Sequence, residues 1–248
     1  MKTRIDQLLV ARGLFDSRSQ ARAAIEAGQV LANGVIVRKA SEQFSDDIAL
    51  EAQPAHPWVG RGALKLDHAL TLWPILVEGR VALDVGASTG GFTEVLLTRG
   101  AAKVFAVDVG FGQMHARVSS DPRVINLERT DARDLTENLI PQPPSLVVCD
   151  ASFISLIKVL PVALDLATPG AELVTLVKPQ FEADGPGGGK KGVIKDARAH
   201  AAAVERVRDW LEALGWAVQA TTESPITGGD GNLEFLLWAK KPGQGRNS

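Results

Sequence analysis

The stretch that decides the fold reads Asp84-Val85-Gly86-Ala87-Ser88-Thr89-Gly90-Gly91-Phe92-Thr93. It follows a short apolar run at 81–85, typical of a buried strand, and leads into a helical pattern at 92–98. Glycines at a strand-to-helix turn let the backbone approach a ligand closely, and the start of the helix offers free N–H groups. This stretch therefore predicts a ligand site at the first turn of an α/β domain.

The residue types in this turn discriminate between ligands. A dinucleotide site requires G-x-G-x-x-G, but Ser88 stands where the second glycine is needed. A P-loop requires Gly-Lys-Ser/Thr at its end, but Phe92 follows the last glycine. An acid before the first glycine, the G-x-x-x-G-G spacing and a second acid at the next strand end, Asp108, fit S-adenosylmethionine.

Acidic side chains are expected to hold the polar parts of this cofactor. Asp108 can accept hydrogen bonds from both ribose hydroxyls, and Asp131 follows the third strand, where it can meet the adenine amino group. The alternative for each acid alone is ordinary capping at a strand end. Two acids at consecutive strand ends beside a glycine turn favour the ligand. The candidate cofactor-binding residues are Asp84, Gly86, Ala87, Ser88, Thr89, Gly90, Gly91, Phe92, Asp108, Asp131, Ala132 and Asp150.

Apolar runs and helical patterns alternate from residue 62 onward. The runs rich in Val and Leu lie at 81–85, 104–109, 124–127, 146–149 and 173–177, and helical patterns lie at 92–98, 154–166 and 196–214. Such runs suit strands buried on both faces of a mostly parallel sheet. The last two strands, at 216–221 and 233–239, have no helix between them and are expected to pair antiparallel. The fold class is α/β, with a doubly wound sheet.

The N-terminal residues follow a different pattern, which predicts a small α+β domain over 1–54. Two short helices are expected, the second capped by Ser17, and Asn33-Gly34 predicts a hairpin with a type I′ turn. A further strand is expected at 48–50. Residues 55–61 carry no periodicity and are interpreted as a linker, 62–243 as the larger domain and 244–248 as a disordered tail.

Four charged residues interrupt patterns that would otherwise be buried: Lys65, Asp150, Lys178 and Glu234. Asp150 and Lys178 end two predicted parallel strands, and Glu234 begins the last, antiparallel strand. The carboxyl ends of parallel strands line the binding crevice of an open sheet, so these three charges are expected at one edge. One such charge is usually a solvated strand end, but three that converge indicate a functional site.

Composition narrows the class of protein. The chain has 248 residues, a net charge of −2, one cysteine and four histidines, which are scattered. These counts exclude an internal disulfide and a cysteine-based zinc site, and we expect no metal. No signal peptide or membrane span is visible, so a cytoplasmic protein without a membrane partner is expected.

Basic residues suggest contact with nucleic acid. Residues 1–65 hold nine Lys and Arg against seven Asp and Glu, and Arg18 and Arg22 lie one helical turn apart. These side chains form either a solvated helix face or a surface that contacts phosphates. The glycine-rich stretch 185–192, which contains Lys190 and Lys191, is either a flexible surface loop or an RNA-contacting one, and both can hold. The candidate RNA-binding residues are Arg4, Arg18, Arg22, Arg38, Lys39, Lys190 and Lys191.

The first 50 residues resemble the S4-type RNA-binding module. The resemblance rests on the pieces Arg4-Ile5-Asp6-Gln7-Leu8-Leu9, Ser17-Arg18-Ser19-Gln20-Ala21, Ile25-Glu26-Ala27-Gly28-Gln29-Val30 and Asn33-Gly34. It favours the RNA-binding interpretation of the basic residues over a merely solvated face.

The four charged residues resemble the Lys-Asp-Lys-Glu tetrad of FtsJ-like ribose 2′-O-methyltransferases. The chain from about residue 3 to 241 resembles the TlyA family of rRNA 2′-O-methyltransferases, also labelled hemolysin A. Specific pieces are Ser88-Thr89-Gly90-Gly91-Phe92-Thr93, Val107-Asp108-Val109-Gly110, Cys149-Asp150-Ala151-Ser152-Phe153-Ile154-Ser155, Val177-Lys178-Pro179-Gln180-Phe181-Glu182 and Gly231-Asn232-Leu233-Glu234. Phe111 departs from the pattern, because relatives often carry Tyr there.

This resemblance implies a Rossmann-like class I methyltransferase fold with a mostly parallel, seven-stranded sheet. It also implies methyl transfer from S-adenosylmethionine to a cytidine 2′-hydroxyl in rRNA of the small subunit, the large subunit or both. Lys178, held by Asp150 and Glu234, would activate that hydroxyl as a base or stabilise its developing charge. Two rival functions are a non-catalytic ribosome-binding factor and a membrane-active hemolysin. The helix at 196–214 mixes acidic with basic residues and is not a cationic membrane face. No oligomeric state follows from the sequence.

Overall fold

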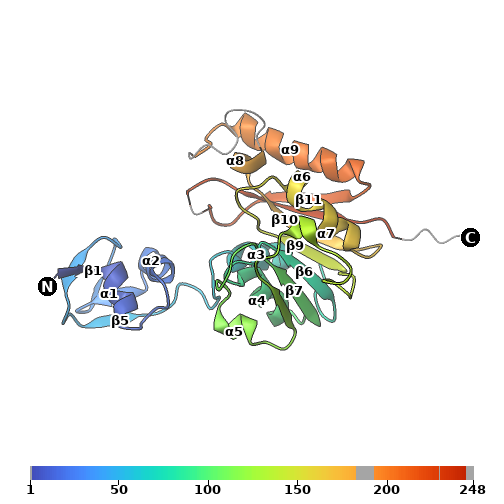
Figure 1. The fold of residues 1–248 in the computed structure, drawn as a ribbon. Coiled ribbons are helices and arrows are strands. Elements are labelled where there is room, and N and C mark those ends of the chain that lie inside the picture. Colours follow the sequence, from blue (N-terminus) through green and yellow to red (C-terminus); the bar gives the residue numbers. More distant parts are fainter. Residues whose placement is uncertain (1, 183–192, 229, 244–248) are drawn as a thin grey trace, which may run out of the picture. The chain divides into compact units, whose positions relative to one another are not determined.

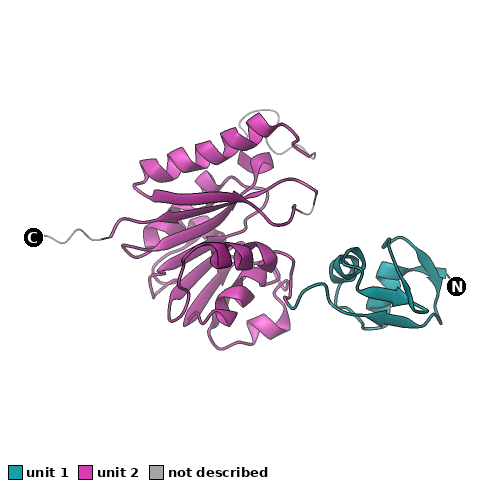
Figure 2. Ribbon diagram, turned by 180° about the vertical axis from the view of Figure 1, so that it is seen from behind, with its two compact units in different colours: residues 1–57 teal, residues 58–248 magenta. Residues whose placement is uncertain are grey.

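The computed structural model describes residues 2–182, 193–228 and 230–243 of the chain. They form two compact units, Met1–Pro57 and Trp58–Ser248 (Figure 2). The division falls inside the stretch expected to be a linker. Val59 is buried in the core of the second unit and Trp58 packs against that core, so the end of this stretch is part of unit 2.

Unit 1 combines two helices with short strands (Figure 1). Its elements are β1 (Lys2–Arg4), α1 (Ile5–Ala11), α2 (Arg18–Glu26), β2 (Val30–Ala32), β3 (Val35–Ile36), β4 (Gln43–Ser45) and β5 (Leu50–Ala52). The Ser17 hydroxyl accepts a hydrogen bond from the Gln20 N–H at 3.3 Å and caps α2, as predicted. Asn33 and Gly34 have φ of 49° and 76°, which supports the predicted turn between β2 and β3.

Unit 2 is built on a seven-stranded sheet in the order β11-β12-β10-β9-β6-β7-β8. Its strands are β6 (Val81–Val85), β7 (Lys103–Val107), β8 (Val124–Leu127), β9 (Leu146–Cys149), β10 (Glu172–Val177), β11 (Ala217–Glu223) and β12 (Phe235–Lys240). Strands β6 to β10 are parallel to one another, and β12 runs antiparallel to both β10 and β11. The predicted sheet, with its antiparallel pair at the C-terminus, is confirmed.

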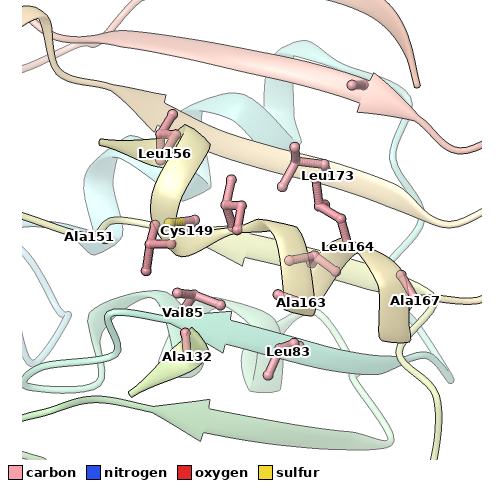
Figure 3. Packing of buried hydrophobic residues seen from close by; sticks show 14 of the residues in the cluster. Leu83, Val85, Ala132, Cys149, Ala151, Leu156, Ala163, Leu164, Ala167 and Leu173 are labelled. Atoms are coloured by element: carbon pink, nitrogen blue, oxygen red, sulfur yellow. The ribbon is translucent and has the colours of Figure 1, made fainter. Parts of the chain in front are cut away.

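Helices cover both faces of this sheet, because alternate residues of each buried strand point to opposite sides. On β6, Ala82 packs with α3 (Ala63–Leu72) and α4 (Gly91–Thr98). Leu83 and Val85 pack with α6 (Leu156–Val159), α7 (Pro161–Leu166) and α9 (Ala197–Ala213), as part of the cluster in Figure 3. The remaining short helices are α5 (Ala116–Ser119), the 3-10 turn η1 (Ala132–Asp134) and α8 (Pro179–Glu182).

One predicted helix is divided in two. The pattern at 154–166 suggested a single helix, but α6 ends at Val159 and α7 begins at Pro161. Proline has no N–H to donate and clashes with the preceding turn, whereas it is tolerated at the first position of a new helix.

The sheet brings several strand ends to one edge. Val177 at the end of β10 pairs with Phe235 at the start of β12, so residues after β10 and before β12 are neighbours. The ends of β6, β7 and β9 lie along the same edge, because these strands are parallel. Among the residues that the structure describes, no helix has the length and apolar content required to cross a membrane.

Candidate active site

The four charged residues singled out in the sequence meet at this edge. Lys65 comes from α3, Asp150 follows β9, Lys178 follows β10 and Glu234 precedes β12. Lys65 Nζ lies 2.5 Å from Glu234 Oε2 and 3.9 Å from Asp150 Oδ2. Lys178 Nζ forms an ion pair with Asp150 Oδ1 at 2.6 Å. The result is a chain of alternating charges that runs from Glu234 through Lys65 and Asp150 to Lys178.

This pairing differs in one respect from the expected one. We expected Glu234 to hold Lys178, but the ion pair of Glu234 within the described chain is with Lys65. A side chain at Gly228 would collide with the Glu234 carboxylate, so the absence of a side chain there makes room for this pair. Lys65, Lys178 and Glu234 are all buried. Burial of paired charges is costly, which indicates a functional reason for keeping them.

A cavity of about 240 Å³ lies against the four charged side chains. It is lined by Gly62, Lys65, Gly86, Ala87, Ser88, Thr89, Gly91, Phe92, Asp150, Ser152, Lys178 and Glu234. Polar and charged groups around so small a space can orient a single hydroxyl or carbonyl group of a substrate. We refer to it as the tetrad cavity.

A larger cavity of about 540 Å³ adjoins it, and we call it the glycine-loop cavity. It is lined by Val85, Gly86, Ser88, Val107, Asp108, Val109, Gly110, Gln113, Thr130, Asp131, Ala132, Arg133, Asp150, Ala151, Ser152, Phe153, Ile154 and Val159. The two cavities share Gly86, Ser88, Asp150 and Ser152. A molecule in one cavity is therefore presented to a molecule in the other.

The turn after β6 has a backbone that only glycine fits. Gly86 has φ of 83°, and a Cβ on it would lie 3.0 Å from the backbone N and Cα of Ala151. Ser88 adopts φ of 47° without being glycine, a conformation that is uncommon for a residue with a side chain. Only a residue without a side chain lets the turn approach the Ala151 backbone this closely.

Asp108 ties the ends of two strands together. Its Oδ2 accepts a hydrogen bond from the Ser88 N–H at 2.8 Å, and its Oδ1 accepts one from the Gly110 N–H at 2.7 Å. A carboxylate has about four acceptor positions, so two remain for the hydroxyl groups of a ligand.

Asp131 lies on the wall of the glycine-loop cavity, but its own neighbour engages it. The Arg133 guanidinium contacts both carboxylate oxygens, with Nη2 at 2.6 Å from Oδ2. The Arg133 N–H also bonds Oδ1 at 2.9 Å. The hydrogen bonds from the Arg133 side chain and backbone lower the pKa of Asp131, so this carboxyl is an anion and a hydrogen-bond acceptor. Ala132, between them, is also part of the wall.

Asp84 is buried behind the turn. It is fully buried on the α4 side of β6, and its Oδ2 accepts a hydrogen bond from Thr93 Oγ1 at 2.6 Å. Burial raises the pKa of Asp84 to about 7, with a smaller contribution from the charge of Asp150, against the hydrogen bonds from Thr93. Of the candidate cofactor residues that the structure describes, Asp84 and Gly90 line neither cavity.

These observations test whether S-adenosylmethionine fits. The glycine-loop cavity has the size of a cofactor site. Gly86 lets the turn and Ala151 meet closely on the cavity wall, and Asp108 and Asp131 present acceptors to a ligand with hydroxyl and amino groups. The residues present therefore fit this cofactor.

In unit 1, three of the candidate RNA-binding residues surround one carboxylate. Asp6 is 0% exposed, and its oxygens lie 3.0 Å from Arg4 Nε, 2.8 Å from Arg18 Nη2 and 3.2 Å from Arg22 Nε. Burial alone would raise the pKa of Asp6, but hydrogen bonds from the three arginines outweigh it and hold the pKa well below its ordinary range. The arginine side chains are about one-third to one-half exposed, so each keeps donors that face solvent.

The other basic candidates are placed differently. Arg38 and Lys39 are exposed, and their backbone N–H groups bond Glu42 Oε1 at 3.1 and 2.7 Å. Lys190 and Lys191 lie outside the described residues, as does the tail at 244–248.

The sequence reasoning missed several residues that line the cavities. Ser152 lines both of them, and Arg133, Gln113 and Thr130 line the larger one. A signal for Ser152 was available, because it lies two residues after Asp150 in a loop that leaves the same strand end. Gln113 and Thr130 carry no such signal.

Comparison with known proteins identifies the family. Residues 58–241 match the FtsJ-like methyltransferase family and residues 3–46 match the S4 domain. The 16S/23S rRNA (cytidine-2′-O)-methyltransferase TlyA of Mycobacterium tuberculosis is 46% identical over 96% of this chain and 90% of its own. Hemolysin A of Brachyspira hyodysenteriae is 36% identical over 94% of this chain and 98% of its own.

A solved structure agrees with these relatives. A protein from Streptococcus thermophilus that carries a hemolysin name has a TM-score of 0.75 and 37% identity, over 97% of this chain and 89% of its own. The S4 match lies within unit 1. The cofactor of FtsJ-like methyltransferases is S-adenosylmethionine, for which the glycine-loop cavity is suited. The chain belongs to the TlyA family of FtsJ-like methyltransferases, with an S4 domain at its N-terminus.

Proposed function

We propose that this protein transfers a methyl group from S-adenosylmethionine to the ribose 2′-hydroxyl of a cytidine in rRNA. The observation that carries the proposal is the chain of alternating charges beside the glycine-loop cavity. The substrate class is supported by the TlyA relative, which covers nearly the whole chain and methylates cytidine 2′-oxygens of 16S and 23S rRNA by name. Because rRNA is the substrate, we place the reaction in the cytoplasm.

The cofactor supplies an electrophilic methyl group when bound, and the residues of this chain position it. Asp108 and Asp131 would accept hydrogen bonds from its polar groups, and Gly86, which lines both cavities, would lie against it. Alignment of donor and acceptor is worth several kcal/mol of the barrier, on the order of 7–11 in favourable systems.

The acceptor hydroxyl is proposed to lie in the tetrad cavity, against Lys178. The Lys178 ammonium is fixed by its 2.6 Å ion pair with Asp150 and can donate a hydrogen bond to the hydroxyl oxygen. As the O–CH₃ bond forms, the S–CH₃ bond breaks with its electron pair left on sulfur, and the hydroxyl proton passes to the Asp150 carboxylate, which lines both cavities. The Lys178 ammonium stabilises the negative charge that develops on the hydroxyl oxygen. Lys65 lies 3.9 Å from Asp150 and is itself held by Glu234 at 2.5 Å, so this pair helps to keep Asp150 in place.

Unit 1 is proposed to bind the phosphate backbone of the RNA. Its three arginines around Asp6 provide outward guanidinium donors, which neutralise phosphates well. Arg38, Lys39, Lys190 and Lys191 are proposed as further phosphate contacts. Small subunits, large subunits or both are candidate substrates.

Methyl transfer itself is the test. Tritium incorporation from labelled S-adenosylmethionine is measured with small subunits, large subunits and naked rRNA, for the wild type and Lys178→Ala. We expect incorporation by the wild type only, at a nucleotide that resists alkaline cleavage. A wild type that binds the cofactor but labels no acceptor would favour a non-catalytic ribosome-binding factor. Labelling that persists in Lys178→Ala would overturn the assignment of the site, and leakage of liposomes by pure protein would support a hemolysin.

A further inference from the structure

Lys178 also contacts a residue outside the four charged ones, Ser152. Its Nζ donates a hydrogen bond to Ser152 Oγ at 2.8 Å and one to the Asp150 carbonyl oxygen at 3.4 Å, in addition to the ion pair with Asp150. An ammonium group has three N–H donors. Two protein oxygens accept hydrogen bonds from the ammonium, the Asp150 carbonyl and the Ser152 hydroxyl, and the Asp150 carboxylate lies at ion-pair distance. Ser152 supplies the only hydroxyl among these three.

The fold fixes Ser152 in this position. Its loop is held at one end by the hydrogen bond from Asp150 N–H to the Val85 carbonyl, at 3.1 Å. At the other end, buried Glu182 accepts hydrogen bonds from Ser155 Oγ at 2.6 Å and from the Leu156 N–H at 2.8 Å. Both Lys178 and Glu182 follow β10, so the same segment that carries the lysine also fixes the loop that carries the serine.

The backbone next to Ser152 is strained, which indicates that the loop shape is imposed. Phe153 has φ of 67°, in the left-handed region that bulky residues rarely adopt, and its ring packs on Phe181 with centroids 5.3 Å apart. Strain of this kind persists where surrounding contacts determine it. Ser152 is thus held at Lys178 by contacts on both sides.

Ser152 differs from the other two oxygens around Lys178 because a hydroxyl of another molecule can replace its hydroxyl. The Asp150 carboxylate and carbonyl are fixed by charge and by backbone, whereas the Ser152 side chain is exposed, rotates about one bond and borders both cavities. Its hydroxyl is also the same chemical group as the acceptor of the proposed reaction. A substrate hydroxyl can therefore replace it at Lys178 without a change in the number of hydrogen bonds.

We propose that Ser152 is a positioning residue for Lys178, which aims the ammonium at the boundary of the two cavities and gives up its place to the substrate hydroxyl. This inference rests on the proposed methyl transfer. Without Ser152, one N–H of Lys178 loses its partner and the ammonium turns toward Asp150. The reacting hydroxyl then meets a lysine that is not aimed at it, so the loss falls on turnover.

The test compares Ser152→Ala, Ser152→Thr and Ser119→Ala. Ser119 is an exposed serine on α5 whose hydroxyl bonds the Ala116 carbonyl of its own helix, at 3.4 Å, and it serves as the matched control. For Ser152→Ala we expect kcat to fall by roughly ten- to a hundredfold, the effect of one hydrogen bond to a charged group. KM for the RNA and the dissociation constant of S-adenosylmethionine, measured by calorimetry, should stay within about twofold of wild type. Ser152→Thr keeps the hydroxyl and should recover most of the turnover.

Three results would overturn the proposal. Wild-type kcat in Ser152→Ala shows that the hydroxyl does not act on Lys178. A loss of cofactor affinity that matches the loss of kcat assigns Ser152 to the cofactor site. An equal loss in Ser152→Thr shows that the position is sensitive to shape and not to the hydroxyl. The melting temperature of each variant identifies a folding defect, and if the wild type itself transfers no methyl group, the proposed function fails instead.

Discussion

Replacement of Asp84 by Asn should change how the stability of unit 2 depends on pH. Burial raises the pKa of this carboxyl from an ordinary 3.8 to about 7. Each pKa unit corresponds to about 1.4 kcal/mol, so a shift of about three units amounts to roughly 4 kcal/mol. Because the folded-state pKa is raised, the stabilising contribution of the protonated form is complete below about pH 4 and is lost as the pH rises to about 7.

The assay is urea unfolding at several pH values. All five tryptophans lie at or after Trp58, so tryptophan fluorescence reports the unfolding of unit 2. The free energy of unfolding of the wild type, minus that of Asp84→Asn, should fall by about 2–3 kcal/mol between pH 5 and pH 7. A difference that stays constant over this range would refute a buried, protonated Asp84.

Two further variants sharpen this measurement. Asp121→Asn is the control, because hydrogen bonds from Arg123 lower the pKa of Asp121 and its titration lies at more acidic pH. The difference in free energy of unfolding between the wild type and Asp121→Asn should stay constant between pH 5 and pH 7. Thr93→Val removes hydrogen bonding that lowers the pKa of Asp84, so the window of falling stability should extend to higher pH.

Two other substitutions address the cofactor turn and the S4 domain. Gly86→Ala should weaken S-adenosylmethionine binding by about tenfold or more in calorimetry, because alanine is strained at φ of 83° and its Cβ would press on Ala151. Gly79→Ala has a similar φ of 73° but no atom within 4 Å, and should lose stability without losing cofactor affinity. Equal affinities of the two variants for S-adenosylmethionine would contradict this role of Gly86. Asp6→Asn removes a negative charge but releases the three arginines, so binding of an rRNA fragment should weaken, by roughly tenfold. Tighter binding, with the S4 domain still folded, would show that charge alone counts.

Much of the fold follows from local patterns. The apolar runs predicted the strands of the parallel sheet because both faces of each strand are buried. The cap at Ser17 and the turn at Asn33-Gly34 were readable because each depends on a few adjacent residues. The break before Pro161 was not predicted, although proline disfavours the interior of a helix, because the apolar pattern continues across it.

The site was harder to derive in detail. Topology brings Lys65, Asp150, Lys178 and Glu234 to one edge, as the strand order indicates, but which lysine pairs with Glu234 depends on distances that no local pattern encodes. The position of Asp84 before the first glycine suggested a ligand contact. Alternation along β6 instead turns its side chain toward α4, and alternation alone does not say which side of a strand faces the ligand.

The ion pair between Lys65 and Glu234 joins residues 169 positions apart, one on the first helix of unit 2 and one at the start of its last strand. Nearly the whole domain must be synthesised and folded before this contact can exist. If the β11–β12 pair opens, Lys65 loses Glu234, its nearer counterion, and keeps only the 3.9 Å contact with Asp150. The cofactor cavity, built from β6 to β9, does not depend on that last strand in the same way. The charges of the proposed catalytic site are therefore assembled only when the last strand of the domain is in place.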